Sequence, residues 1–400
     1  MQIAPDTHLT YCTNIHAANG LDQVLDSVAH YGSILKANLS PDAPFGVGLR
    51  LSGSESQEAL QPEGLDTLRA TLEENGLYVF TMNGFPHGPF HNRVIKDDVH
   101  RPDWEMPERA AYTKRLARIL AHMLPDGASG GISTSPLSYK PWRGPVTRET
   151  WTTFVRHLGD VVKELVLHRE RTGTLIHLDI EPEPDGLLEN SSEVVTFFHE
   201  WLLPVGATLL GKALGMPAGA AEACLRDHVR ICWDTCHVAV AFEKPHEVLA
   251  RYRSRGIRVG KIQVSSAIKV DLNQDRREIQ SSLLPFLDTT YLHQVVQRNR
   301  DGSFASYLDL APALEHLSDE NAIEWRIHYH VPIFTDGVGI LQSTQESIRE
   351  TFALLRDEPF TEHLEIETYT WEVLPKRLKL PLAASIEREF TWALSEYSMS

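Results

Sequence analysis

The stretch HLEIETYTWEVLP, residues 363–375, alternates two kinds of side chain. Successive side chains of an extended strand point to opposite faces, so one face of this strand would be apolar and the other rich in carboxylates. The polar face would hold His363, Glu365, Glu367 and Tyr369. Two acids at i and i+2 are costly to bury without a cation or a network of donors. The stretch therefore indicates a metal or acid/base site, and the alternative is an edge strand with a solvated acidic face.

Seven more strand-like runs precede this one, and longer segments with helical spacing separate them. The runs cover residues 8–16, 45–52, 77–88, 127–136, 174–184, 229–242 and 258–268. The helical segments cover 21–39, 65–76, 108–124, 149–171, 193–214, 218–227 and 384–397. Alternating strands and helices are typical of a parallel sheet. With eight strands, the expected fold class is α/β, a (β/α)8 TIM barrel.

Residues 269–362 form a long insertion before the last expected strand. Two strand-like pieces lie inside it, at 291–297 and 325–334, with a helix-like piece at 308–317 between them. Ordinary connections have roughly 2–6 residues, and such excess length usually carries function. We expect the insertion to lie over the C-terminal mouth of the barrel; the alternative is that one of its pieces is itself a barrel strand. No repeat or linker divides the chain, so residues 1–400 are expected to form one domain.

Composition limits the class of partner. The net charge of −16 gives no broad basic field, which argues against nucleic acid as a partner. The four cysteines, Cys12, Cys224, Cys232 and Cys236, show no CxxC spacing, and a reducing cytoplasm is the simplest fit. The first residues lack the features of a signal peptide, and no run of about 18 apolar residues predicts a membrane span. The expectation is a soluble cytoplasmic protein that binds a small-molecule metabolite.

Polar residues gather near the C-terminal ends of the expected strands, and those ends meet at one mouth of a parallel barrel. Each residue alone has an ordinary explanation as a surface or turn residue, but their recurrence at one end is informative. Carboxylates and imidazoles in this mixture suit a divalent ion such as Mn, Mg, Co or Zn. The cysteines beside Asp234 are expected to be core residues instead. The polar residues are Asn14, His16, Asn83, His87, His91, Glu181, Glu183, Asp234, His237, Gln263, Glu365 and Glu367, with His293, His328 and His330 from the insertion.

The order of a Glu at 181, the Asp-x-x-His of WDTCH, the polar residue of KIQV and the closing Glu of LEIETY resembles the xylose-isomerase-like TIM barrels. That group includes sugar-phosphate isomerases and ketose 3-epimerases. More closely, six motifs spread over most of the chain resemble the EboE-type metabolite-traffic proteins. They are LTYCTNIH, PFGVGLRLS, EPEP, CWDTCHVAV, WRIHYHVPIF and HLEIETYTWEVLP.

The resemblance implies a metal ion held by Glu181, Asp234, Gln263 and Glu367. It also implies a catalytic pair, Glu181 and Glu367, that exchanges protons at a carbon next to a carbonyl, with His237 as a substrate contact. The other expected substrate contacts are Asn14, His16, Asn83, His87, His293, His328, His330 and Glu365. The chain departs from the epimerase pattern at Gln263, where those enzymes present a histidine. An amide oxygen is a poorer transition-metal ligand than imidazole, and a histidine of the insertion could take its place.

Three functions compete at this stage. The leading one is a metal-dependent isomerase or epimerase acting on a small polyhydroxy or carbonyl compound, in which a metal polarises an oxygen and a carboxylate removes the adjacent proton. The second is a non-catalytic barrel that binds or escorts a metabolite, with partner proteins of the same pathway, as the EboE resemblance implies. The third is a metal-dependent endonuclease, against which the acidic balance counts.

Overall fold

The computed structural model describes residues 1–89, 94–287, 290–371 and 379–399. Eight parallel strands stand side by side in the order of the sequence. They are β2 (Thr7–Tyr11), β3 (Phe45–Arg50), β4 (Leu77–Asn83), β5 (Gly130–Thr134), β6 (Ile176–Ile180), β7 (Val229–Asp234), β8 (Val259–Val264) and β15 (His363–Ile366). A short strand, β1 (Gln2–Ala4), pairs antiparallel with β2.

The sheet closes on itself between its first two parallel strands. β15 pairs with β8 on one side and β2 on the other, and a parallel bridge between Cys12 and Gly48 joins the β2 and β3 edges. The fold is therefore an α/β (β/α)8 barrel. Because β15 lies between two neighbours, the reading of residues 363–371 as a solvated edge strand is wrong.

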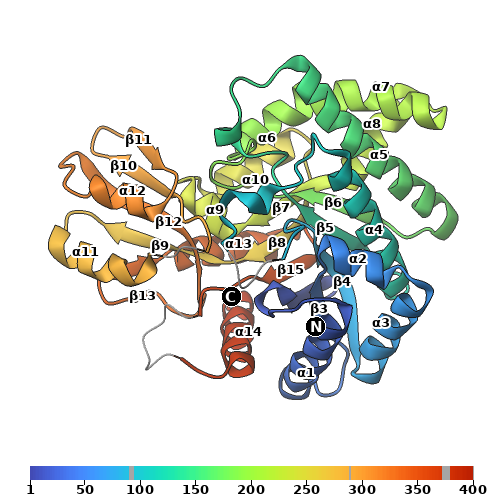
Figure 1. Ribbon diagram of the computed structural model, residues 1–400, viewed down its shortest axis with the longest axis horizontal. Helices are drawn as coiled ribbons and strands as arrows, with labels where there is room; N and C mark the ends of the chain where they lie inside the picture. Colours follow the sequence, from blue (N-terminus) through green and yellow to red (C-terminus); the bar gives the residue numbers. More distant parts are fainter. Residues whose placement is uncertain (90–93, 288–289, 372–378, 400) are drawn as a thin grey trace.

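Helices follow the strands and cover the outside of the barrel (Figure 1). The larger ones are α1 (Leu21–Leu39), α3 (Pro62–Glu74), α4 (Pro107–Met123), α5 (Arg148–Thr172), α7 (Leu203–Leu214), α8 (Ala218–His228), α10 (Pro245–Ser254), α13 (Gln345–Asp357) and α14 (Leu382–Ser398). Shorter ones are α2 (Gly53–Ala59), α6 (Ser191–Phe197) with a π-helical turn at Phe198–Leu202, and α9 (Thr235–Val240), with 3-10 turns at Thr13–Ile15, Lys96–His100, Lys140–Trp142 and Leu284–Phe286.

One helical stretch, Ser191–Leu214, is long and apolar enough to cross a membrane by length and composition alone. Half of the apolar window is buried inside the protein, however. Both α6 and α7 contribute residues to the main hydrophobic core, among them Val194, Phe197 and Leu210. This burial is what a core helix of a barrel requires.

The insertion builds a second, six-stranded sheet beside the barrel mouth (Figure 1). Its strands are β9 (Ser266–Asp271), β10 (Val295–Asn299), β11 (Phe304–Tyr307), β12 (Ala322–Val331), β13 (Gly337–Val338) and β14 (Leu341–Ser343), with α11 (Arg276–Leu283) and α12 (Leu310–Glu315) packed on it. A separate hydrophobic cluster around Trp325 and Ile279 lies under these elements. Neither strand-like piece of the insertion is a barrel strand, and α9 packs against β9 and β12 to hold this sheet to the barrel.

All eight expected barrel strands form, and each ends before its sequence pattern does; in two of them the structure shows why. The run 229–242 was expected to be one strand, yet its second half is α9, because the Asp234 side chain caps a helix at that point. The run 258–268 divides at Ser265 into β8 of the barrel and β9 of the insertion sheet. Its apolar alternation continues across the break, so periodicity alone could not reveal the division.

Charged side chains fill part of the barrel interior. Lys261 Nζ lies 2.8 Å from Glu365 Oε1, and both side chains are fully buried. Burial is the largest single effect on Lys261 and lowers its pKa, but Glu365, Cys232 and Cys12 together raise the pKa above its ordinary value. The glycines of the neighbouring strands leave room for these groups: a Cβ at Gly48 would collide with the Glu365 carboxylate, and one at Gly260 with the carboxylate of Asp179. The small residues are thus required by close approach.

Replacing Lys261 alone should strongly destabilise the protein. Lys261→Met leaves the Glu365 carboxylate buried without its cation, and we expect the free energy of unfolding to fall by about 3–5 kcal/mol. The double variant Lys261→Met/Glu365→Met should recover most of that loss, because no charge is then left unpaired. Chemical denaturation monitored by circular dichroism measures both values.

The matched control is Lys244→Met, which breaks the exposed Lys244–Glu247 ion pair. Exposed pairs contribute about 0–1 kcal/mol, so this variant should unfold like the wild type. Equal losses in Lys261→Met and in the double variant would mean that packing, not the buried charge pair, determines stability at this position.

Candidate functional site

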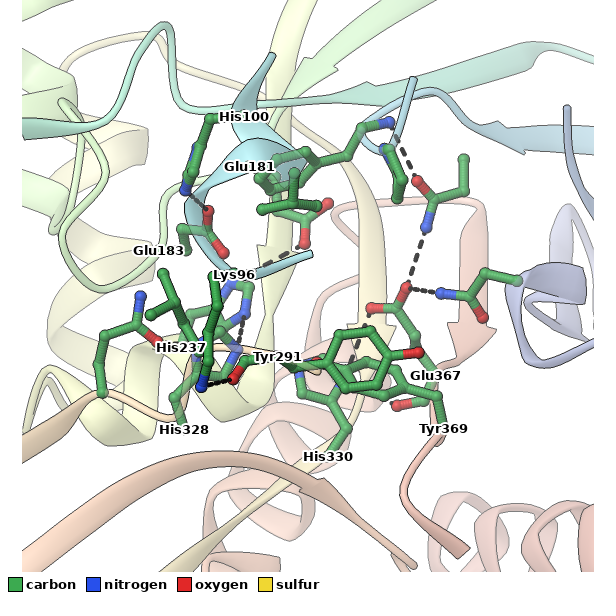
Figure 2. Close-up of a pocket in the computed structure, with 17 residues that line it drawn as sticks. Lys96, His100, Glu181, Glu183, His237, Tyr291, His328, His330, Glu367 and Tyr369 are labelled. Carbon is green, nitrogen blue, oxygen red and sulfur yellow. Dashed lines mark hydrogen bonds and ion pairs between the residues drawn. The ribbon is translucent and has the colours of Figure 1, made fainter. Parts of the chain in front are cut away.

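A pocket opens at the carboxyl ends of the barrel strands, between the barrel and the insertion (Figure 2). It encloses a cavity of about 70 Å³. Its lining combines carboxylates, imidazoles, amides and aromatic rings from both parts of the chain. The lining residues are Asn14, Asn83, Phe85, Pro86, Lys96, Val99, His100, Glu181, Glu183, His237, Tyr291, Leu292, Gln294, His328, His330, Glu367 and Tyr369.

Three buried carboxylates meet at the base of this pocket. Glu181 directly follows β6, Asp234 ends β7 and Glu367 directly follows β15. One oxygen from each lies within 4.8 Å of the other two, close enough for one ion to reach all three. Their exposed fractions are 3%, 1% and 5%. The parallel strands of the barrel bring these side chains together although they come from distant parts of the sequence.

Three amide groups hold the Glu367 carboxylate in place. Asn14 Nδ2 donates to Oε1 at 2.6 Å, and Asn83 Nδ2 donates to the same oxygen at 2.9 Å. Gln263 Nε2 donates to the other oxygen, Oε2, at 2.7 Å. The amides come from the ends of three different strands, so the orientation of Glu367 depends on the closed barrel.

Asp234 is fixed by a helix terminus. Its Oδ1 atom accepts hydrogen bonds from the backbone N–H groups of Cys236 and His237 and from Ser265 Oγ. These bonds cap α9 in the way that an aspartate at a helix N-terminus usually does. The other oxygen, Oδ2, is buried and makes no hydrogen bond. One oxygen therefore orients the side chain, and the second lies 3.8 Å from the Nε2 atoms of both His237 and His330.

Burial and mutual repulsion perturb the acids of the site. Burial raises the pKa of Glu181 well above its ordinary value, and Asp234 and Glu183 raise it further. Burial also raises the pKa of Glu367, with repulsion from Glu181 and Asp234 adding to the effect. The pKa of Glu183 is raised first by burial and then by Asp234. Acids with raised pKa values in a cleft are typical of sites that bind cations or move protons.

Three imidazoles complete the site, and each is oriented by a hydrogen bond at Nδ1. His237 Nδ1 lies 3.0 Å from the Pro182 carbonyl oxygen, His328 Nδ1 2.8 Å from Gln294 Oε1, and His330 Nδ1 2.9 Å from the Glu367 carbonyl oxygen. Since a carbonyl can only accept, each Nδ1 carries the hydrogen. His328 and His330 are two residues apart on β12, so the insertion supplies both to the barrel mouth (Figure 2).

The residues present fit a divalent cation. Four buried polar atoms of the cluster make no hydrogen bond: Glu181 Oε2, Asp234 Oδ2, Gln263 Oε1 and His330 Nε2. Buried polar atoms without partners are rare in folded proteins. His330 Nε2 lies 3.8 Å from Asp234 Oδ2, so the unpartnered imidazole nitrogen belongs to the same cluster as the carboxylates. Oxygen and imidazole donors in this mixture suit Zn, Mn or Co.

The structure brings most of the predicted site residues to this pocket. Asn14, Asn83, Glu181, His237, His328, His330 and Glu367 line it, and Asp234 and Gln263 touch the lining residues from below. Gln263 presents its amide nitrogen to Glu367, so the observed contact is a hydrogen bond to a neighbouring acid. Its role as a metal ligand, like the roles of the other residues, stays a prediction.

Four predicted substrate contacts do not line the pocket. Glu365 faces the barrel interior, two residues before Glu367, and pairs there with Lys261. His16 lies beside Tyr11 and stacks on Tyr31. His87 packs edge-on against Tyr112 in a separate surface cleft, and His293 stacks on Tyr329. His91 and residues 372–375 lie outside the described residues.

Sequence reasoning missed several lining residues. Lys96 and His100 belong to a 3-10 turn that lies just beyond the Gly- and Pro-rich loop that follows β4. His100 Nε2 lies 3.2 Å from Glu183 Oε1. The irregular length of that loop was the available signal, but nothing in it indicated which side chains turn inward. Phe85 and Tyr291 carried no signal, because single aromatic residues in loops are common.

The cysteines form no disulfide; Cys12, Cys232 and Cys236 are buried and Cys224 is partly exposed. Cys236 Sγ comes within ligand distance of His328 and His330. Burial raises the pKa of its thiol well above the ordinary value, and Asp234 adds to the shift. Cys236 Sγ donates to the Tyr329 carbonyl oxygen at 3.5 Å, so the thiol has a partner within the protein.

No family model matches the chain, and no curated protein sequence matches it. Solved structures similar to it include the IolI protein with a bound zinc atom, with 14% identity, a TM-score of 0.47, and coverage of 98% of this chain and 100% of that chain. A xylose isomerase-like TIM barrel protein from Mycobacterium smegmatis in complex with magnesium has 10% identity, a TM-score of 0.48, and coverage of 98% and 96%.

The D-allulose 3-epimerase from Methylomonas sp. in complex with D-allulose is also similar, with 9% identity, a TM-score of 0.45, and coverage of 99% of this chain and 96% of that chain. These structural neighbours are xylose isomerase-like TIM barrels. Because the identities and TM-scores are low, function is inferred below from the geometry of this site alone.

Glu181→Gln should stabilise the metal-free protein at neutral and higher pH. A carboxyl group whose pKa is raised on folding, here above 4.5, binds more protons in the folded than in the unfolded state, so its contribution to stability falls as pH rises. The amide removes this loss and the repulsion of Asp234. In thermal melts with a chelator between pH 7 and 9, the melting temperature of the variant should exceed that of the wild type increasingly with pH.

The histidines of the site contribute little to this pH dependence. The ordinary histidine pKa of about 6.5 lies below the range of the experiment, and burial lowers the pKa values of His237, His328 and His330 further. Adding Zn²⁺ should reverse the order, since only the wild type keeps the charged ligand. A variant that melts below the wild type at every pH, with or without the ion, would show that Glu181 serves packing.

Proposed function

We propose that this protein is a metal-dependent isomerase or epimerase-like enzyme that acts on a small polyhydroxy or carbonyl metabolite. The single observation that carries the proposal is the group of Glu181, Asp234 and Glu367, whose oxygens lie within 4.8 Å of one another at the base of a pocket. Three such acids in a buried site repel one another, and a divalent cation offsets that repulsion. Their position at the carboxyl ends of the barrel strands is where active sites of this fold are found.

The ion would be held by Glu181, Asp234 and Glu367, with His330 as the imidazole ligand. His330 would replace Gln263 as the fourth ligand, because its Nε2 atom is buried, makes no hydrogen bond and lies 3.8 Å from Asp234 Oδ2. Its Nδ1 donates to the Glu367 carbonyl oxygen, the pattern by which metal-binding histidines are usually oriented. A bound divalent ion would polarise a carbonyl or hydroxyl oxygen of the substrate.

Glu181 and Glu367 would exchange protons with the carbon next to that carbonyl. Burial keeps the pKa values of both well above those of ordinary carboxyls, and a general base is most effective when its pKa is close to the working pH. The two acids come from β6 and β15, which two other barrel strands separate. A substrate carbon between them could lose a proton to one glutamate and regain it from the other on the opposite face.

The walls of the pocket support a small, hydroxyl-rich ligand. Phe85, Tyr291 and Tyr369 supply aromatic surface for the C–H faces of such a molecule, and His237 and Lys96 supply polar contacts near the carboxylates. The net charge of −16 argues against the endonuclease function, because binding to a phosphate backbone depends on basic side chains.

A second candidate is a barrel of the EboE type that binds and passes on a metabolite without converting it, together with partner proteins of its pathway. The observation that favours it is the Gln263 amide, which donates to Glu367 Oε2 where the epimerase pattern places an imidazole. A neutral amide on one catalytic acid would favour its charged form and weaken its action as a proton donor.

Proton exchange distinguishes the two candidates. We expect the protein, loaded with Mn²⁺ or Co²⁺ and incubated with a panel of ketopentoses and ketohexoses in D₂O, to place deuterium on the carbon beside the carbonyl of at least one of them. Nuclear magnetic resonance measures the exchange. Glu181→Gln and Glu367→Gln should each reduce its rate by about 10²–10⁴-fold, since each removes a proton carrier.

Glu362→Gln is the matched control, because Glu362 is an exposed glutamate at the opposite end of β15 and bonds to Ser129. It should leave the exchange rate unchanged. Saturable sugar binding with no exchange at any carbon would reject the enzyme and favour the binding protein.

A further inference from the structure

Two imidazoles of the pocket face each other through their ring nitrogens. His237 Nε2 and His328 Nε2 lie 3.0 Å apart (Figure 2). Both side chains are buried, with exposed fractions of 4% and 7%. One comes from α9 of the barrel and the other from β12 of the insertion, so the pair forms only where the two parts of the protein meet.

The hydrogen bonds on the far side of each ring determine which nitrogens carry hydrogen. His237 Nδ1 donates to the Pro182 carbonyl oxygen. His328 Nδ1 donates to Gln294 Oε1, and Gln294 is oriented because its own Nε2 donates to the Pro184 carbonyl oxygen. Both acceptors are carbonyl oxygens, so both Nδ1 atoms hold the hydrogen. In the neutral rings, both Nε2 atoms are then lone-pair acceptors.

Two lone-pair acceptors that lie 3.0 Å apart repel each other unless a positive charge lies between them. A divalent cation supplies that charge while both rings stay neutral, because neutral imidazole nitrogen is itself the ligand.

We propose that Glu183, His237 and His328 hold a second divalent cation, beside the one assigned to Glu181, Asp234 and Glu367. One ligand atom from each of the three residues lies within 4.8 Å of the other two. With metal–nitrogen distances of about 2.0–2.1 Å, a separation of 3.0 Å between the nitrogens corresponds to an angle of about 95° at the ion. That angle falls between octahedral and tetrahedral geometry.

Glu183 supplies an independent indication of a ligand. Its side chain is buried, and its Oε1 atom makes no hydrogen bond although His100 Nε2 lies 3.2 Å away. Two imidazoles and one carboxylate form a set that suits Zn²⁺ or Co²⁺ better than Mg²⁺ or Ca²⁺, which prefer oxygen ligands.

The two sites share a boundary at Asp234. Its unpartnered Oδ2 atom lies 3.8 Å from His237 Nε2 on one side and 3.8 Å from His330 Nε2 on the other. Two ions that share this carboxylate would bind two neighbouring oxygen atoms of one substrate. The expected ligand class is therefore an α-hydroxy carbonyl compound or a vicinal diol. The second site shares Asp234 with the proposed function but depends on Glu183 and His328, which the first ion does not use, so the second ion can be absent while the proposed function holds.

The test is a count of tightly bound ions. Protein stripped with a chelator is titrated with Co²⁺ alone, in competition with a chromophoric chelator, and bound cobalt per chain is measured together with its visible absorption. We expect two equivalents for the wild type. His328→Gln and Glu183→Gln should each retain one, and Glu181→Gln should lose the first site while the imidazole-rich absorption of the second persists.

The control is His228→Gln. His228 is also a buried histidine whose Nδ1 bonds to a backbone carbonyl, but it is the last residue of α8, directly before β7, at the other end of the barrel. It should keep two equivalents, and thermal melts of each variant show whether it folds. One equivalent in the wild type that His328→Gln and Glu183→Gln both retain would overturn the second site and leave the proposed function standing. No tight binding by the folded wild type would overturn both.

Discussion

The burial of like charge at the mouth of the barrel is the constraint on which the rest of the structure depends. Glu181, Asp234 and Glu367 are held within reach of one another and away from water. Packing alone does not favour this arrangement, because Asp234 raises the pKa values of Glu181 and Glu367, and Glu181 raises that of Glu367 further. A folded protein tolerates such a cluster where a cation or a transferred proton offsets the desolvation and repulsion of the carboxylates.

The surroundings of the acids are organised to maintain that cluster. Asparagine and glutamine amides hold both oxygens of Glu367, and the start of α9 holds one oxygen of Asp234. In both cases the donors orient the carboxylate without neutralising it. The histidines are oriented in the same manner, since carbonyl groups occupy their Nδ1 atoms and leave Nε2 directed to the pocket.

The barrel interior shows the contrasting solution to the same problem. Two residues before Glu367 on the same strand, Glu365 is paired directly with Lys261, and both are completely buried. Its charge is balanced within the chain, so the pair serves stability. The acids of the mouth have no lysine or arginine within ion-pairing distance among the described residues. This difference separates a structural carboxylate from one that is available to a ligand.

Local sequence patterns were sufficient to predict the barrel and most of the residues at its C-terminal mouth. Strand and helix periodicities predicted all eight barrel strands, because alternation and helical spacing are local properties that a parallel sheet with outer helices requires. The same order predicted that Glu181, Asp234 and Glu367 would meet, since the carboxyl ends of parallel strands share one edge. The excess length of residues 269–362 indicated an additional part near the mouth.

The partners of each polar side chain, in contrast, could be known only from the tertiary structure. Glu365 lies on β15 and Glu367 directly follows this strand, and their different partners, Lys261 and a set of amides, come from other segments of the chain. The division of residues 258–268 into two sheets and the capping of α9 by Asp234 likewise depend on contacts between distant segments. His328 and His330 face the acids, whereas His293 does not, because the register of β12 against β9 and β10 turns these two side chains to the barrel. Register and side-chain partners are set by long-range packing, which local patterns do not contain.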